Sequence, residues 1–165
     1  MNSTDPGRID PQRMKRGPFQ TRQGTTTIAD LLRMTGVPVA PSDDAARMPV
    51  TLRKVHAGES LVHEGAPAEA LFFVCAGTFK VFRTDEDGYE QVLAFALRSE
   101  VLGFDALCMT SYPVAISALE ESAVYVVPRC DIPRLCEALP AFGLMLQRSG
   151  SLTLAHSREL VDIMA

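Results

Sequence analysis

The sequence predicts a mainly β fold, a jelly roll flanked by short helices and followed by a long C-terminal helix. Between positions 50 and 127, short runs rich in β-branched and aromatic residues alternate with turn residues at intervals of about 8–12 positions, the spacing of a sandwich or barrel. From Pro140 onward the apolar residues instead follow helical spacing for most of the remaining chain. A double sheet closed on itself, with one long helix after it, satisfies both patterns.

Turn signals separate the predicted strands. The strongest is Asp87-Gly88, which lies between two apolar runs and predicts a tight hairpin. The eight strands are predicted at 50–55, 60–63, 70–75, 78–84, 89–96, 101–102, 114–119 and 123–127.

Helical segments are predicted on both sides of the strands. Thr27 is placed to cap a first helix that ends near Gly36, and residues 43–47 are expected to form one helical turn. Asp131 is expected to cap a helix that runs to about Leu139. The domain boundaries follow from these segments: a β-roll domain with its flanking helices over 26–139, and the start of a long helix over 140–165.

The last helix carries small residues at its middle. Ser149, Gly150 and Ser151 interrupt the apolar positions. Small residues in the interior of a helix either weaken it or let another backbone approach closely.

Length and charge exclude several classes of protein. With 165 residues the chain forms one domain of ordinary size, and its net charge of −4 argues against a surface that binds nucleic acid throughout. Residues 1–25 hold five basic and two acidic residues, a net charge of +3, which leaves −7 for the remainder. This polar stretch is predicted to be a disordered, solvated arm, with a nucleic-acid contact as the alternative.

Because no apolar run reaches about 18 residues and no secretory signal is present, we expect no membrane partner and a cytoplasmic protein.

Residues that carry catalytic or metal chemistry form no recognisable pattern. Cys75, Cys108, Cys130 and Cys136 include no Cys-x-x-Cys pair, so free thiols are expected. His56 and His63 flank the first predicted hairpin without the His-x-His pair that a cupin metal site needs, and are expected to be exposed turn residues. We therefore expect no metal, no cofactor and no enzymatic activity.

Several motifs resemble a known family of regulators. His56-Ala57-Gly58-Glu59-Ser60 and its continuation to Gly65 resemble the opening of the cyclic-nucleotide-binding β-roll. The stretch 71–77 looks like its next strand and glycine turn, and 87–92 is similar to its long hairpin. The pair Leu-Gly-Phe-Asp-Ala-Leu at 102–107 and Pro-Val-Ala-Ile-Ser-Ala-Leu-Glu at 113–120 resembles the FNR branch of the CRP/FNR transcription factors. The resemblance covers residues 53–165.

The resemblance implies a sensor and dimerisation domain. In that family a β-roll senses a signal, a long helix forms a parallel homodimer, and a C-terminal helix-turn-helix domain binds DNA. The segment 141–165 matches the start of the dimer helix, and no helix-turn-helix follows it in this sequence, so DNA contact is expected only through a domain absent from the chain. The dimer contacts are expected from Met145, Leu146, Leu152, Leu160 and Ile163. Two alternatives remain: a cyclic-nucleotide-binding regulatory module, and a stand-alone dimer that titrates full-length partners.

The resemblance also places the effector pocket, and the residues there argue against a cyclic nucleotide. In members that bind cyclic AMP, a Gly-Glu pair holds the ribose and an Arg-Ser or Arg-Thr pair neutralises the phosphate. Here Phe104 stands in place of the Glu, Val114-Ala115 stand in place of the Arg pair, and no Lys, Arg or His occurs from 99 to 128. A buried phosphate without a cation is costly. The expected pocket residues are Gly103, Phe104, Asp105, Ala106, Leu107, Val114 and Ala115.

Two further properties of the family are tested against the sequence. Oxygen-sensing members hold an iron–sulfur cluster with N-terminal cysteines and one on a later strand. Here residues 1–74 contain no cysteine and Tyr125 stands at the strand position, so no cluster is expected. In the FNR branch the long hairpin contacts RNA polymerase, which makes Asp85, Glu86, Asp87 and Gly88 candidate contacts; the alternative is a solvated hairpin tip.

Overall fold

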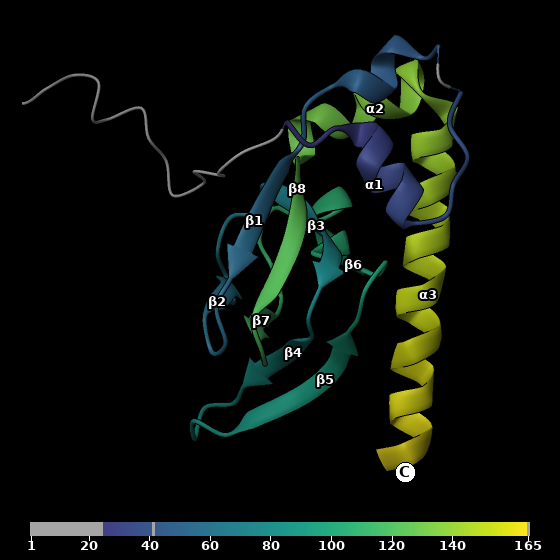
Figure 1. The fold of residues 1–165 in the computed structure, drawn as a ribbon. Coiled ribbons are helices and arrows are strands. Elements are labelled where there is room, and N and C mark those ends of the chain that lie inside the picture. The colour runs from purple at the N-terminus through teal and green to yellow at the C-terminus, as the bar shows by residue number, and fades with distance from the viewer. Residues whose placement is uncertain (1–24, 41, 165) are drawn as a thin grey trace, which may run out of the picture.

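Eight antiparallel strands in two sheets form the body of the described chain, which confirms the predicted jelly roll (Figure 1). The computed structural model describes residues 25–40 and 42–164, with the backbone alone for residues 157 and 160–164. The predicted arm at 1–25 and the side chains of Leu160 and Ile163 thus lie outside the described residues, apart from Thr25. The strands are β1 (Thr51–Val55), β2 (Ser60–Val62), β3 (Ala70–Ala76), β4 (Phe79–Thr84), β5 (Glu90–Ala96), β6 (Val101–Leu102), β7 (Ala115–Ala118) and β8 (Ser122–Pro128).

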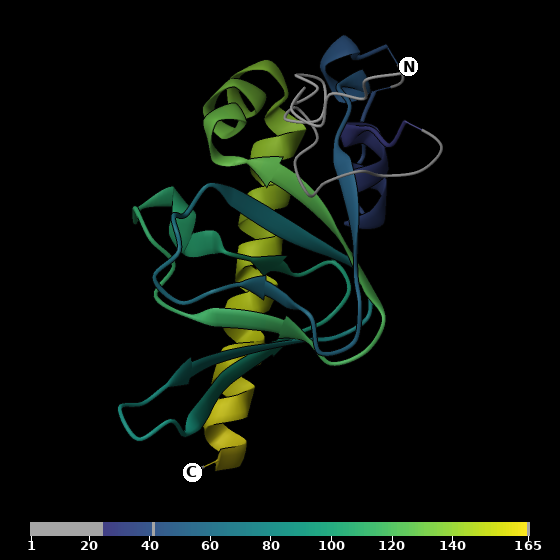
Figure 2. The same cartoon turned by 90° about the vertical axis from the view of Figure 1, so that its left-hand side faces the viewer.

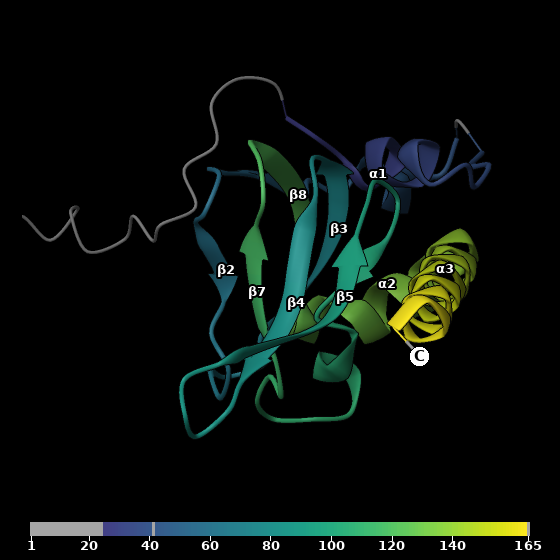
Figure 3. The same ribbon diagram turned by 90° about the horizontal axis from the view of Figure 1, so that it is seen from below.

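The two sheets are built from strands far apart in sequence. One sheet has the order β1-β8-β3-β6 and the other β2-β7-β4-β5. Figure 3 looks along the roll and shows the two sheets facing each other, with α3 outside them. The register pairs Phe73 with Tyr125 in the first sheet and Phe79 with Ala118 in the second.

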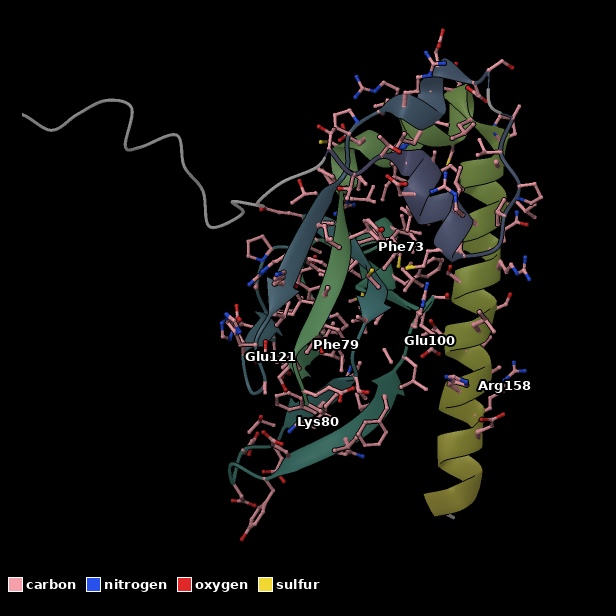
Figure 4. All side chains as sticks on the ribbon, viewed as in Figure 1. Phe73, Phe79, Lys80, Glu100, Glu121 and Arg158 are labelled. Carbon is pink, nitrogen blue, oxygen red and sulfur yellow. The ribbon has the colours of Figure 1, made fainter. Side chains whose placement is uncertain are left out.

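The core lies between the sheets and continues under the helices. Phe73 and Phe79 are fully buried and lie inside the roll (Figure 4). Four successive residues of β3, Leu71 to Val74, are all buried, because one face of the strand packs on the opposite sheet while the other is covered.

A tight turn between β3 and β4 depends on a glycine. Gly77 has φ +85°, and a Cβ there would lie 2.0 Å from the Oγ of Ser122. Only a residue without a side chain fits both the conformation and the space.

The first helix begins as the sequence predicts. α1 (Ile28–Met34) has Thr27 as its N-cap, and the Thr27 backbone N–H donates to the Asp30 carboxylate at 2.8 Å. That bond holds the pKa of Asp30 below its usual value. A short 3-10 helix, η2 (Asp44–Arg47), follows, capped by the carboxylate of Asp43.

The helix after the last strand starts differently from the prediction. A 3-10 turn, η4 (Arg129–Asp131), precedes α2 (Ile132–Ala138), and the Asp131 side chain makes no capping hydrogen bond. It lies instead 3.3 Å from the guanidinium of Arg134. Asp131 therefore stands at the predicted N-cap position but makes no side-chain cap, because the chain enters α2 already in helical conformation, with φ −85° and ψ −18° at Asp131.

The final helix, α3 (Pro140–Met164), runs without a break along the whole roll (Figure 2). Its docked face carries the buried residues Phe142, Met145, Leu146 and Ser149. None of the helices in the described residues is long and apolar enough to cross a membrane.

Candidate functional site

The predicted effector segment joins β6 to β7 along one end of the roll. Gly103 follows β6 with φ +74°, and a Cβ there would lie 3.1 Å from the carbonyl oxygen of Ala70. A short 3-10 helix, η3 (Phe104–Leu107), begins at once. Within it Ala106 is fully buried, whereas Leu107 is 40% exposed and Asp105 is partly buried.

Tyr112 fixes the far end of the segment to the roll. Its hydroxyl donates to the Ala70 carbonyl at 2.6 Å and accepts from the Ala70 N–H at 3.1 Å. Its backbone exchanges hydrogen bonds with Gly65 and Ala66. Burial raises the pKa of the Tyr112 hydroxyl, so it remains a neutral donor.

Phe104 faces the long helix. A Cβ built at Gly150 would lie 3.2 Å from the Phe104 Cζ, so the glycine leaves room for the ring. The small residues in the middle of α3 therefore accommodate an aromatic side chain of the effector segment, in a helix that stays intact. The sequence shows the glycine but not the partner, since the two residues are 46 positions apart.

The remaining pocket residues lie on the wall of the roll. Val114 precedes β7 and is 8% exposed, and Ala115 begins β7 and is 9% exposed. Neither supplies a charge or a side-chain hydrogen bond.

Two guanidinium groups reach this segment from elsewhere in the chain. Arg83 on β4 donates through Nε to the Pro113 carbonyl at 3.0 Å, directly before Val114. Arg129 donates to the Met109 carbonyl at 2.8 Å. The stretch 99–128 contains no cation in sequence, yet cations lie against it in space, which the sequence reasoning missed.

Those arginines still differ from a built phosphate site. Both donate to backbone carbonyls, and the Arg83 side chain is on the exposed part of its strand. Phe104 offers no acceptor for a ribose hydroxyl. The residues present thus do not match the Glu and Arg pattern of members that bind cyclic AMP.

The predicted dimer residues separate into different environments. Met145 is fully buried and Leu146 is 8% exposed, both covered by their own chain, so neither is available to a second helix in this structure. Leu152 is 42% exposed. Two leucines outside the predicted set, Leu144 and Leu154, are exposed by 55% and 53%. The burial of Met145 and Leu146 has a physical reason, since α3 packs on the roll and on α2.

The acidic hairpin tip is held by one of its own carboxylates. Asp85 accepts the backbone N–H groups of Asp87 and Tyr89 at 3.0 and 2.9 Å. Gly88 has φ +87°. Glu86 and Asp87 are exposed, and Tyr89, which the sequence reasoning did not single out, is 74% exposed.

Metal-binding groups do not gather in the described part of the chain: no cluster of three or more His, Cys, Asp or Glu side chains has the arrangement for an ion. The four cysteines are free thiols, and burial raises the pKa of Cys136. His56 lies on the surface, 3.0 Å from the Glu121 carboxylate. A cavity of about 390 Å³ lies away from the effector segment, between α1 and η2, and is lined by residues that include Arg33, Val37 and Arg47.

Comparison with known proteins agrees with the fold. The cyclic nucleotide-binding domain model matches residues 52–138. The transcriptional activator protein Anr of Pseudomonas aeruginosa is 30% identical over 113 residues, which cover 68% of this chain and 46% of Anr. The solved N-terminal domain of a transcriptional regulator from Streptomyces coelicolor is 27% identical with a TM-score of 0.53, covering 70% of this chain and 79% of that one.

A more distant structure shares the fold. Catabolite Activator Protein of Thermus thermophilus is 21% identical with a TM-score of 0.59, covering 79% of this chain and 62% of that one. The chain spans a little under half the length of the curated relatives it matches, 46% for Anr and 45% for Electron transport regulator A of Shewanella oneidensis. From the family match, the chain belongs to the cyclic nucleotide-binding domain family, and its sequence is similar to that of the FNR-type regulators named above.

Proposed function

We propose that this chain is the sensor and dimerisation domain of an FNR-type transcription regulator, and that it controls DNA binding by a separate C-terminal domain. The observation that carries the proposal is the contact between Phe104 of the effector segment and Gly150 of α3. It connects the part of the roll that senses the signal to the helix that would transmit it. The regulators' names and the shared domain support a regulatory rather than an enzymatic role.

The second half of α3 supplies the dimer surface. Leu152 is 42% exposed in the single chain, and a partner helix is its natural cover. Burying such side chains contributes about 1.5–3 kcal/mol each, part of which association entropy offsets. A reversible homodimer is therefore expected, with α3 pairing in parallel.

Sedimentation equilibrium tests this surface. The variant Leu152→Asp is expected to weaken dimerisation at least about tenfold, because the change removes more than the 1.4 kcal/mol that a factor of ten requires. Leu119→Asp is the matched control, since Leu119 is 47% exposed in the turn before β8. Dimerisation of Leu152→Asp equal to that of the wild type would place the interface elsewhere and refute the assignment.

A cyclic-nucleotide-binding module is the second candidate, and the position of Arg83 beside Val114 favours it. The absence of a ribose acceptor and of an Arg pair in the segment argues against it. Titration calorimetry with cyclic AMP and cyclic GMP is expected to show no binding at sub-millimolar concentration. If micromolar binding does occur, two variants decide whether the Arg83 guanidinium holds the nucleotide. Binding that is lost in Arg83→Gln but kept in Lys54→Gln, which removes an exposed cation on β1, would establish the second candidate.

DNA and RNA polymerase are assigned to different parts of the regulator. The acidic body of the chain repels phosphates, so this chain alone is expected to show no sequence-specific gel shift at physiological salt.

Glu86 and Asp87 on the hairpin tip are the proposed polymerase contacts, because Asp85 is occupied within the turn. Reversing both charges should weaken pull-down of RNA polymerase, whereas Glu64→Lys, on another exposed turn, should not; equal recovery would leave the tip as a solvated loop.

A further inference from the structure

Glu100 is a carboxylate buried at the corner between β5 and β6, where the roll meets α3 (Figure 4). The residue is 2% exposed. One carboxylate oxygen accepts the Leu97 backbone N–H. His156 Nδ1 on α3 lies 2.5 Å from the other oxygen, Oε1, so the imidazole is the group that compensates its charge. An isolated buried carboxylate is costly, and this one has a histidine from the helix as its counter-charge.

The corner is held in a strained shape by contacts to three other elements. Ser99 adopts φ +73°, a left-handed conformation that a residue with a side chain rarely takes. Its hydroxyl donates to the Met34 carbonyl of α1, and its N–H donates to Val74 of β3. Beside it, the Val101 N–H donates to the Thr153 hydroxyl of α3 at 3.4 Å, and the same hydroxyl donates to the Val101 carbonyl at 3.2 Å.

We propose that Glu100 and His156 form a protonation-controlled latch that holds the second half of α3 against the roll. The latch is closed when the imidazole carries its proton or when the carboxyl is neutral. It opens when the carboxylate is charged and the imidazole is not, because a buried charge is then left without compensation. The inference goes beyond the proposed function, since it concerns the docking of α3 whether or not the chain dimerises.

The pKa of the Glu100 carboxyl sets the direction in which the docking of α3 changes with pH. Burial raises the pKa of Glu100 above its ordinary value, while the Leu97 N–H and the charge of His156 lower it. A group whose pKa is raised in the docked state favours that state most at low pH, and the contribution is lost as pH rises through the raised pKa.

No other titratable or charged group near the corner provides a second counter-charge for Glu100. In the described part of the chain, no ion pair joins Glu100 to the titratable side chains of the elements packed against it other than His156. They are Arg33 on α1, Cys75 on β3, Arg98 on the corner, and Arg148, Arg158 and Glu159 on α3.

Hydrogen exchange of the Val101 and Leu97 amides measures the latch in the full chain, because these N–H groups donate to Thr153 and Glu100. After correction for intrinsic exchange, protection in the wild type is expected to fall about tenfold or more as pH rises through the raised pKa of Glu100. Glu100→Gln should stay protected throughout this rise. His156→Gln should lose protection at a lower pH than the wild type, because ionisation of the carboxyl alone then opens the latch.

A matched control is available at the opposite end of the roll. His56 forms an imidazole–carboxylate pair with Glu121 at 3.0 Å, but both side chains are more than 70% exposed. His56→Gln should therefore reproduce the wild-type profile at Val101. The latch is refuted if His156→Gln keeps the wild-type protection and pH profile, or if Glu100→Gln keeps the pH dependence. Because no arm of the experiment uses DNA, nucleotide or a dimer, its failure is distinct from failure of the proposed function.

Discussion

Adding one methyl group at Gly150 tests whether the effector segment presses on α3. A Cβ at this position would lie 3.2, 3.4 and 3.7 Å from three atoms of the Phe104 ring. Gly143, in the same helix, has nothing within 4 Å of its Cβ position and serves as the control. In a helix interior, Gly→Ala gains about 1 kcal/mol.

The two effects at Gly150 oppose each other. Phe104 is 40% exposed, so its ring is able to shift by the few tenths of an ångström that the methyl group requires. Displacing it weakens a handful of contacts worth about 0.1–0.2 kcal/mol each, a total of about 0.5 kcal/mol. Gly150→Ala is therefore expected to stabilise the chain by about 0.5 kcal/mol, and Gly143→Ala by about 1 kcal/mol.

Urea denaturation measures both changes, with and without Phe104→Ala. Removing the ring should bring the two glycine variants to the same gain, since only the Gly150 methyl group meets it. Equal gains while Phe104 is present would show that the ring does not press on the helix. A clear loss of stability in Gly150→Ala would show that the ring cannot yield, and would contradict the expected gain of about 0.5 kcal/mol.

Three further changes have defined outcomes. Gly77→Ala should lower the free energy of unfolding by at least about 2 kcal/mol, measured by thermal denaturation, because its Cβ would overlap Ser122. Gly88 has φ +87° but open space around its Cβ position, so Gly88→Ala should lower it only by the backbone strain of about 1–2 kcal/mol. Tyr112→Phe should cost about 1–2 kcal/mol in urea, since it removes two hydrogen bonds to the backbone of β3. Asp30→Asn should lower stability slightly, by about 0.5 kcal/mol at neutral pH, and the difference should disappear as pH falls through the lowered pKa of Asp30, because that contribution exists only while the carboxylate is charged.

Local patterns predicted most of the fold. Turn glycines and alternating β-formers place the strands to within one or two residues, and Thr27 with Asp30 specifies the start of α1. These signals are local: each depends on a few adjacent residues and on backbone preferences that hold in any fold. The failed cap at Asp131 is an exception, because a 3-10 turn after β8 had already set the helical conformation.

The candidate site was harder to predict because its contacts span large sequence separations. Arg83 meets Pro113 across 30 positions, and Glu100 meets His156 across 56. The same reason explains Met145 and Leu146: helical spacing shows that a face is apolar, but not whether the roll or a second chain covers it. Only the packing of α3 on the roll decides between the two.

That packing gives α3 three contacts of different kinds on one side of the roll. Gly150 accommodates the Phe104 ring, Thr153 exchanges hydrogen bonds with Val101, and His156 faces Glu100. The helix residues are three apart, so the contacts follow one another by less than a turn each. Their partners all belong to the stretch 100–104, which contains β6 and the start of the effector segment. A displacement of this stretch therefore changes steric, hydrogen-bonding and charge contacts with the helix together.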